Sequence, residues 1–206
     1  NGRAQEALLR AALADAALTA DELALAEAHG TGTALGDPIE TGSLSAAYLS
    51  ARTVAETLVV GSIKANAGHA EPAAGISGMF KLAVQLMTAY AVPNAMLQEL
   101  NPHVAATLAG RTVGLPVATM PLPSCAPEDP RIGGVSSFGY SGTIVHVLLE
   151  VTSAAASAVQ LPIVDYTRKR YSWYKSERPA SGGAAAAAPT AEATPKWYAT
   201  EWSEVI

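Results

Sequence analysis

The sequence Ala28-His29-Gly30-Thr31-Gly32-Thr33 follows a short apolar run, and so does a second histidine-bearing turn, Lys64-Ala65-Asn66-Ala67-Gly68-His69. A histidine held next to glycines after a strand lies exposed at a sheet edge, where the backbone can approach a ligand closely. Two such turns in one small domain predict a divided active site.

The composition limits the classes of protein and of partner. The chain has 206 residues, of which 50% are hydrophobic, and this is enough to bury one sizeable core. The net charge of −5 gives no basic surface for nucleic acid, so we predict no nucleic-acid partner. No apolar run is long enough to cross a bilayer, and the first residues lack a secretory signal. We therefore expect a soluble chain without a membrane span, whose compartment, cytoplasmic or organellar, stays unknown.

The single cysteine, Cys125, excludes an internal disulfide framework and a cysteine-based metal site, and no metal is predicted. It lies in a proline-broken loop without the electropositive setting that lowers a thiol pKa. We expect it to be an ordinary loop thiol.

Helix-like and strand-like segments alternate along the chain, which is typical of the α/β class. Asp37 and Pro38 fit the cap and the first position of one helix. The helix of 72–90 has apolar residues on nearly all sides, so we expect it to be central. The predicted helices cover 4–18, 38–51 and 72–90, and the predicted strands cover 23–28, 57–63, 131–137 and 143–151.

The turn Phe138-Gly139-Tyr140-Ser141-Gly142 joins the last two predicted strands, and we expect it to be a third contribution to the site. Beyond it the composition changes. We divide the chain into a folded region of 1–152, an aromatic and basic segment of 153–178, an extended Ala, Pro and Gly linker of 179–195, and the start of a further region at 196–206.

Three motifs, at 28–40, 61–69 and 134–143, resemble in their order the motifs of β-ketoacyl synthases, most closely the ketosynthase domains of modular polyketide synthases. The resemblance covers only the second half of such a domain. It implies the C-terminal half of a thiolase-like fold, a layered mixed β-sheet with helices, followed by an extended linker tail. The residues of 196–206 faintly resemble the beginning of a ketoreductase region.

The resemblance implies an acyltransferase that performs a decarboxylative Claisen condensation. A cysteine on the missing N-terminal half would carry an acyl group, and a malonyl-type extender on an acyl carrier protein would attack it. His29 and His69 would donate hydrogen bonds to the extender thioester carbonyl, and Lys64 would orient the second histidine. No cofactor would bind directly, since the carrier protein delivers the phosphopantetheine.

The same resemblance implies further binding residues and partners. Thr31, Thr33 and Asn66 would contact the substrate or its pantetheine arm, and Phe138 with Gly139 would lie beside the cysteine. Thr31 and Thr33 could instead cap a local turn. The expected partners are the cysteine-bearing half, the acyl carrier protein and, for the complete ketosynthase, a second copy in a homodimer.

Ile144 departs from the family pattern, which usually has asparagine there, whereas His146 is retained in a strand and is expected to be structural. Two hypotheses stay open. The chain is either the C-terminal half of an active ketosynthase or a ketosynthase-derived structural subunit. In both, the apolar face meant for the first half would be exposed, so we expect the isolated chain to be unstable.

Overall fold

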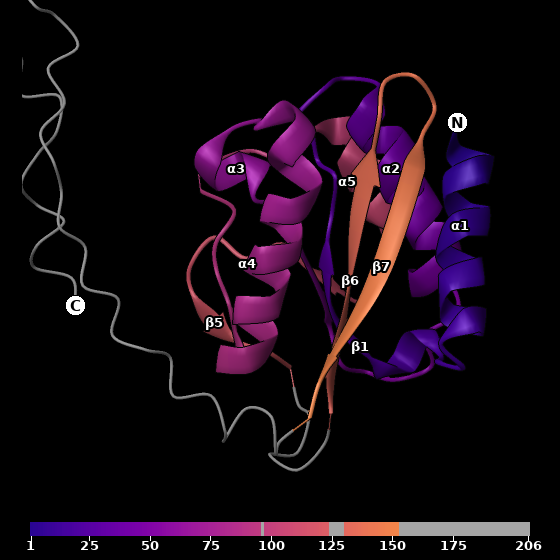
Figure 1. Cartoon of the computed structure of the whole chain (residues 1–206), viewed down its shortest axis with the longest axis vertical. Helices are drawn as coiled ribbons and strands as arrows, with labels where there is room; N and C mark the ends of the chain where they lie inside the picture. The colour runs from indigo at the N-terminus through magenta and orange to yellow at the C-terminus, as the bar shows by residue number, and fades with distance from the viewer. Residues whose placement is uncertain (96, 124–129, 153–206) are drawn as a thin grey trace, which may run out of the picture. The chain divides into compact units, whose positions relative to one another are not determined.

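The computed structural model describes residues 1–95, 97–123 and 130–152 (Figure 1). The predictions for Cys125 and for the segments 153–178, 179–195 and 196–206 lie outside the described residues. Within them the predicted alternation of helices and strands is confirmed. The helices are α1 (Gly2–Asp15), α2 (Gly36–Leu44), α3 (Lys64–Ala67), α4 (Ala74–Thr88) and α5 (Pro102–Leu108). The strands are β1 (Leu23–Glu27), β2 (Leu58–Gly61), β3 (Tyr90–Ala91), β4 (Val113–Gly114), β5 (Met120–Pro121), β6 (Arg131–Phe138) and β7 (Ile144–Val151).

A five-stranded mixed sheet with the order β4-β2-β1-β6-β7 forms the centre of this region. The first four strands run parallel, and β7 returns antiparallel to β6. Because parallel strands end at the same edge, the segments that follow β1, β2 and β6 meet there. The turns predicted to form the site follow those three strands.

The two faces of the sheet carry separate cores. Leu25, Val59 and Val135 pack against Leu82 and Leu86 of α4 on one face. On the other face, α1, α2 and α5 enclose a larger cluster around the fully buried Tyr48. Figure 1 shows α4 on one side of the sheet and α1 and α2 on the other. Burial of apolar surface on both faces fixes the sheet between helical layers.

Helix α4 differs from the prediction of a central helix. Its inner face packs on the sheet, but Ile76, Phe80 and Val84 are exposed along its outer face. Val145 and Val147 of the edge strand β7 are exposed as well. The sequence pattern correctly finds apolar residues around the helix, but the described residues cover only one side of it.

The start of α2 also differs from the prediction. The helix begins at Gly36, whose N–H donates to Thr33 Oγ1 at 3.1 Å, so Asp37 is not the cap. The Asp37 carboxylate instead accepts the N–H of Gly32 at 3.1 Å. The acidic side chain therefore ties the preceding loop to the helix.

His146 has the structural role that the sequence predicts. Its Nε2 lies 2.7 Å from the Tyr48 hydroxyl and its Nδ1 lies 3.0 Å from the Ser136 hydroxyl. The ring faces the core, and burial lowers its pKa to about 4.

In the part of the chain that the structure describes, no helix has both the length and the apolarity to cross a membrane.

Candidate active site

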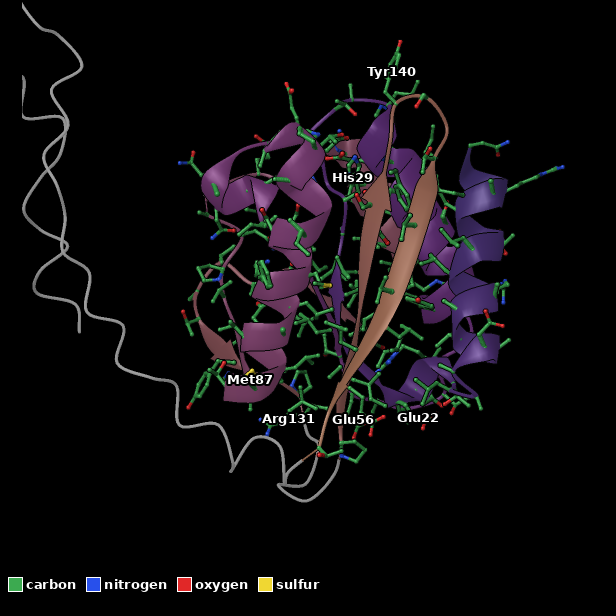
Figure 2. The ribbon with its side chains drawn as sticks, viewed as in Figure 1. Glu22, His29, Glu56, Met87, Arg131 and Tyr140 are labelled. Carbon is green, nitrogen blue, oxygen red and sulfur yellow. The ribbon has the colours of Figure 1, made fainter. Side chains whose placement is uncertain are left out.

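The predicted site residues His29, Lys64, His69 and Phe138 meet at one edge of the sheet. The His29 and His69 rings are 5.8 Å apart between centroids and nearly perpendicular, and the Phe138 ring lies 5.5 Å from His29. Figure 2 shows His29 at the end of the sheet near the hairpin tip of Tyr140, whereas Glu22, Glu56 and Arg131 lie at the opposite end. The three turns therefore come together at one edge of the sheet, and their use as one active site stays a prediction.

The hydrogen bonds of His29 define which ring nitrogen carries the proton. Its Nδ1 is 3.3 Å from the backbone N of Phe138 and 3.3 Å from Nζ of Lys64. A backbone N–H and a lysine ammonium can only donate, so Nδ1 must accept. The proton of the neutral imidazole is then on Nε2.

The surroundings of His29 also favour its neutral form. The ring is half-buried, and its pKa is lowered to about 4, first by burial and then by the positive charges of Lys64 and His69. A neutral imidazole at pH 7 can donate a hydrogen bond through Nε2 without carrying a charge.

His69 has the same tautomer by a different contact. The backbone N–H of Glu71 donates to His69 Nδ1 at 2.9 Å, which leaves the proton on Nε2. Gly68, which ends α3, has a φ of +78°, a conformation that favours glycine and that turns the chain toward His69. Unlike His29, His69 is exposed.

Lys64 contacts the first histidine, His29, whereas the family resemblance implied that it orients the second, His69. Its Nζ donates to the carbonyl oxygen of His29 at 2.5 Å, in addition to the contact with the ring. The reason is the register of the parallel strands, which places Glu27 beside Gly61. His29 and Lys64 follow these two residues closely, so their segments leave the sheet side by side.

Glu40 is a member of the site to which the sequence analysis gave no role. Its carboxylate is buried and accepts the N–H of His29 at 2.7 Å and the N–H of Gly30 at 2.9 Å. Burial raises its pKa, while the two N–H donors act in the opposite direction. The available signal was an acidic residue in a helix that begins directly after the first histidine turn.

The two threonines contact the local backbone and each other. Thr31 Oγ1 lies 3.3 Å from Thr33 Oγ1, and Thr33 accepts the N–H of Gly36, which is the turn-capping role left open above. Thr31 also lines the cavity described below.

Asn66, Gly139 and Ile144 lie at the margin of the site. Asn66 is exposed, and its amide donates to the carbonyl of Pro93 at 3.0 Å. Gly139 closes the hairpin through its N–H, which donates to the Thr143 carbonyl at 2.7 Å. Ile144 pairs with Phe138 in the β6–β7 register, so the departure from the family pattern leaves this turn hydrogen-bonded.

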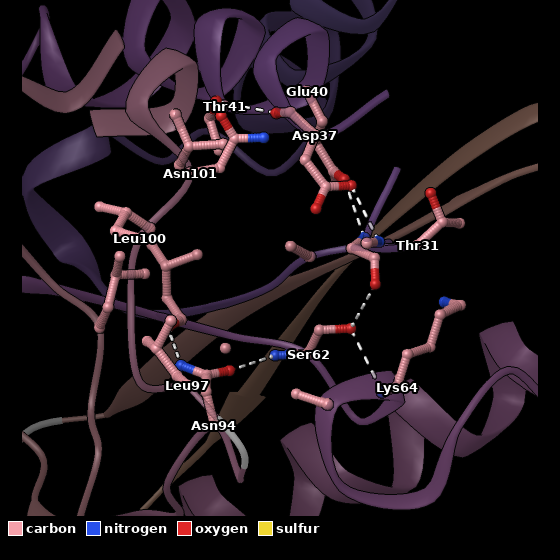
Figure 3. A pocket seen from close by; sticks show the side chains of 18 of the residues that line it. Thr31, Asp37, Glu40, Thr41, Ser62, Lys64, Asn94, Leu97, Leu100 and Asn101 are labelled. Carbon is pink, nitrogen blue, oxygen red and sulfur yellow. Dashed lines mark hydrogen bonds between the residues drawn. The ribbon is translucent and has the colours of Figure 1, made fainter. Parts of the chain in front are cut away.

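A cavity of about 650 Å³ opens next to Lys64 and His69. Figure 3 shows Asp37 and Glu40 on one wall and Ser62, Lys64 and Asn94 across from them. Nowhere in the described ranges do three or more His, Cys, Asp or Glu side chains gather in a way that could hold a metal ion.

Comparisons of the sequence with known proteins point to one family. The family model described as the C-terminal domain of β-ketoacyl synthase matches residues 1–98. Over 150 residues, the chain is 46% identical to a spectinabilin polyketide synthase system protein of Streptomyces orinoci and 45% identical to a phenolphthiocerol/phthiocerol polyketide synthase subunit of Mycobacterium tuberculosis. Each alignment covers 73% of this chain, but only 4% and 7% of those proteins.

Solved structures lead to the same group of proteins. An oxazolomycin ketosynthase domain from Streptomyces albus is 37% identical with a TM-score of 0.65, and a bacillaene ketosynthase from Bacillus amyloliquefaciens is 31% identical with a TM-score of 0.67. Each comparison covers 73% of this chain and 26% of the solved chain. The described fold is therefore about a quarter of those longer chains.

Proposed function

Because this chain belongs to the ketosynthases of polyketide synthases and corresponds to their C-terminal part, we propose that it supplies the two catalytic histidines of a decarboxylative condensation. One observation carries the proposal. His29 and His69 face each other at 5.8 Å, and each has an Nδ1 that accepts a hydrogen bond, so that each presents an Nε2–H donor.

The reaction proceeds through an enolate. An acyl group is bound as a thioester to a cysteine of the other half, and a malonyl-type thioester arrives on an acyl carrier protein. The bond to the carboxylate of the extender breaks, carbon dioxide leaves, and the electron pair delocalises onto the thioester oxygen. The enolate carbon then attacks the acyl thioester, a carbon–carbon bond forms, and the cysteine leaves as a thiolate.

His29 and His69 stabilise the oxygen on which charge develops. Each Nε2–H donates to the thioester oxygen of the extender, and a preorganised donor of this kind contributes about 3–4 kcal/mol to transition-state stabilisation. Two donors from different segments fix the oxygen between them. A neutral His29 suits this role because its proton stays on the ring at pH 7.

Lys64 acts on His29 as a positioning residue. It holds the backbone carbonyl and the Nδ1 of His29 at once, and its positive charge opposes protonation of the ring. It is placed to orient the histidine and not to attack a substrate.

The phosphopantetheine arm is part of the substrate, and no cofactor is required. Thr31 lies at the cavity next to Lys64 and His69, where a hydroxyl can contact the arm. Phe138 and Gly139 shape the side of the site next to His29, where the cysteine of the other half is expected.

The exposed apolar residues of α4 and β7 indicate where the cysteine-bearing half packs. Ile76, Phe80 and Val84 are exposed on α4, and Val145 and Val147 are exposed on β7. Exposed apolar side chains gathered on one helix and one edge strand favour an interface there. The solved ketosynthase chains are almost four times as long as the matched region, which supplies the polypeptide to cover it. The complete ketosynthase would then form a homodimer.

The test uses the chain together with its cysteine-bearing half, here called the complete ketosynthase. We expect the cysteine to be acylated by an acyl thioester and carbon dioxide to be released from malonyl-carrier protein. His29→Ala and His69→Ala should each lower carbon dioxide release by about 100-fold to 1,000-fold but leave acylation unchanged, as measured by mass spectrometry. His103→Ala, which changes an exposed histidine of α5, is the matched control. A complete ketosynthase that neither becomes acylated nor releases carbon dioxide would support the non-catalytic structural subunit.

A further inference from the structure

A buried ion pair lies beneath the two histidine turns. Glu27 is the last residue of β1 and Lys81 belongs to α4, and Glu27 Oε2 is 2.6 Å from Lys81 Nζ. The side chains are 1% and 7% exposed, respectively. The second carboxylate oxygen of Glu27 accepts the backbone N–H of Ile63. The pair is therefore shielded from solvent, and it joins the segments that carry the histidines.

Each partner of this network belongs to an element that precedes or follows a member of the proposed site in the sequence. Glu27 precedes His29 by two residues, and Ile63 directly precedes Lys64. Lys81 belongs to the helix that follows the His69 turn. One carboxylate thus connects the supports of both histidines, which come from segments far apart in the sequence.

The backbone around the pair leaves room for it. A Cβ on Gly61 would lie 3.1 Å from Lys81 Nζ, and a Cβ on Gly78 would lie 3.4 Å from Glu27 Cγ. Two elements, β2 and α4, therefore approach the charged groups at positions without a side chain.

Stability alone is a weak reason for this arrangement. Burying two charges costs several kcal/mol per ion in desolvation, and well-packed apolar residues of similar size often give equal or higher stability. What the ion pair adds is a strong, short contact between fixed partners, since the Lys81 ammonium donates to the Glu27 carboxylate at 2.6 Å.

We propose that Glu27 and Lys81 are a positioning pair that sets the placement of His29 relative to His69. This inference rests on the proposed function, because the pair would act only through the two histidines. By holding the end of β1, the start of α3 and the middle of α4 together, it keeps both Nε2–H donors aimed at one oxygen.

The test is the double variant Glu27→Gln/Lys81→Met in the complete ketosynthase. Removing both charges avoids an uncompensated buried charge, and both replacements are close in size to the originals. We expect cysteine acylation and the melting temperature to stay near those of the wild type, while carbon dioxide release falls at least tenfold. A purely structural pair would lower acylation and decarboxylation together, or neither, and either of these results overturns the inference.

A second variant keeps the test decisive should the double variant not fold. Gly61→Ala displaces the Lys81 ammonium without changing any charge, and we expect a several-fold loss of decarboxylation with acylation unchanged. Gly114→Ala, on the neighbouring strand β4, is the matched control, because its Cβ would meet only the Thr57 side chain, at 3.0 Å. Equal decarboxylation in these two variants would overturn the inference.

The wild type separates this inference from the proposed function. Without carbon dioxide release from the wild type, the proposed function fails. With wild-type release and an unchanged rate in the double variant, only the positioning role fails.

Discussion

The two histidine turns are built very differently. His29 is held on its N–H by Glu40, on its carbonyl by Lys64, and on its ring by Lys64 and the Phe138 N–H. His69 is exposed, and its ring has one hydrogen bond, from the Glu71 N–H. The His29 ring is therefore held in place by contacts within this chain, whereas the His69 ring is held by the short turn that carries it.

The difference follows from the sheet. β1 lies between β2 and β6, so the segment after it is surrounded by the segments after both neighbours and by the start of α2. The His69 turn lies on the exposed end of α3. We expect its remaining contacts to come from the cysteine-bearing half, which makes the second donor dependent on assembly.

The largest expected effect is the loss of either imidazole. His29→Ala and His69→Ala should each lower carbon dioxide release by about 100-fold to 1,000-fold, because each removes one donor to the enolate oxygen. Rates with malonyl-carrier protein measure this directly. Should His69→Ala retain the wild-type rate, the exposed histidine has no part in the chemistry. The comparison of the two histidine turns as two donors would then fail.

Acid should destabilise the fold through His29 and His146. The pKa values of His29 and His146 in the folded chain are about 4, against the ordinary histidine value of 6.5, so the unfolded chain binds protons first as the pH falls. Stability is then fully present above pH 6.5 and is lost as the pH falls toward 4, by about 3 kcal/mol for the more buried His146.

Melting curves of the complete ketosynthase between pH 7 and 4 measure this loss. His146→Gln, which keeps a polar group beside Tyr48 and Ser136, should show a weaker dependence on pH. The same slope in wild type and variant would mean that other groups titrate.

A smaller effect is expected from the carboxylate that holds the first turn. Glu40→Gln leaves one of two buried N–H groups without an acceptor, which costs about 1–3 kcal/mol of stability. We expect a lower melting temperature and about a tenfold loss of decarboxylation, the equivalent of 1.4 kcal/mol.

Glu71→Gln is the matched control beside the second histidine. There the backbone N–H, and not the carboxylate, contacts His69, so the rate should not change. A larger loss from Glu71→Gln than from Glu40→Gln would reverse the ranking of the two turns.

The smallest expected effect is at Asn66. Its amide donates to the Pro93 carbonyl on the exposed side of α3, outside the set of residues that line the cavity. Asn66→Ala should change the KM for malonyl-carrier protein less than threefold, because an exposed hydrogen bond contributes near the lower end of the range of about 0.5–1.5 kcal/mol. A tenfold rise in KM would place Asn66 in the pantetheine contact that the sequence motif implies.

The sequence motifs were sufficient for the family and for the fold class. The α/β pattern and the C-terminal half of a thiolase-like fold are confirmed, because three ordered motifs lie on strands and turns whose apolar spacing is local. The histidine turns were found for the same reason, since glycine and histidine after a buried strand form a local signal.

Long-range polar contacts were not predictable in this way. Glu40 and the Glu27–Lys81 pair act across 10 to 54 residues, and no spacing rule connects a carboxylate to a backbone N–H or an ammonium so far away. The resemblance assigned Lys64 to the second histidine, His69, whereas the β1–β2 register places its ammonium against His29.

By itself the sequence determined the order of elements, the family and the positions of the two histidine turns, because hydrophobic spacing and glycine-bearing turns act over a few residues. Only the tertiary structure decided the tautomers of these histidines, the contact of Lys64 with His29 and the exposed outer face of α4. These features depend on which strands are neighbours and in what register. Register places atoms from distant segments within hydrogen-bond distance, and no local pattern encodes that placement.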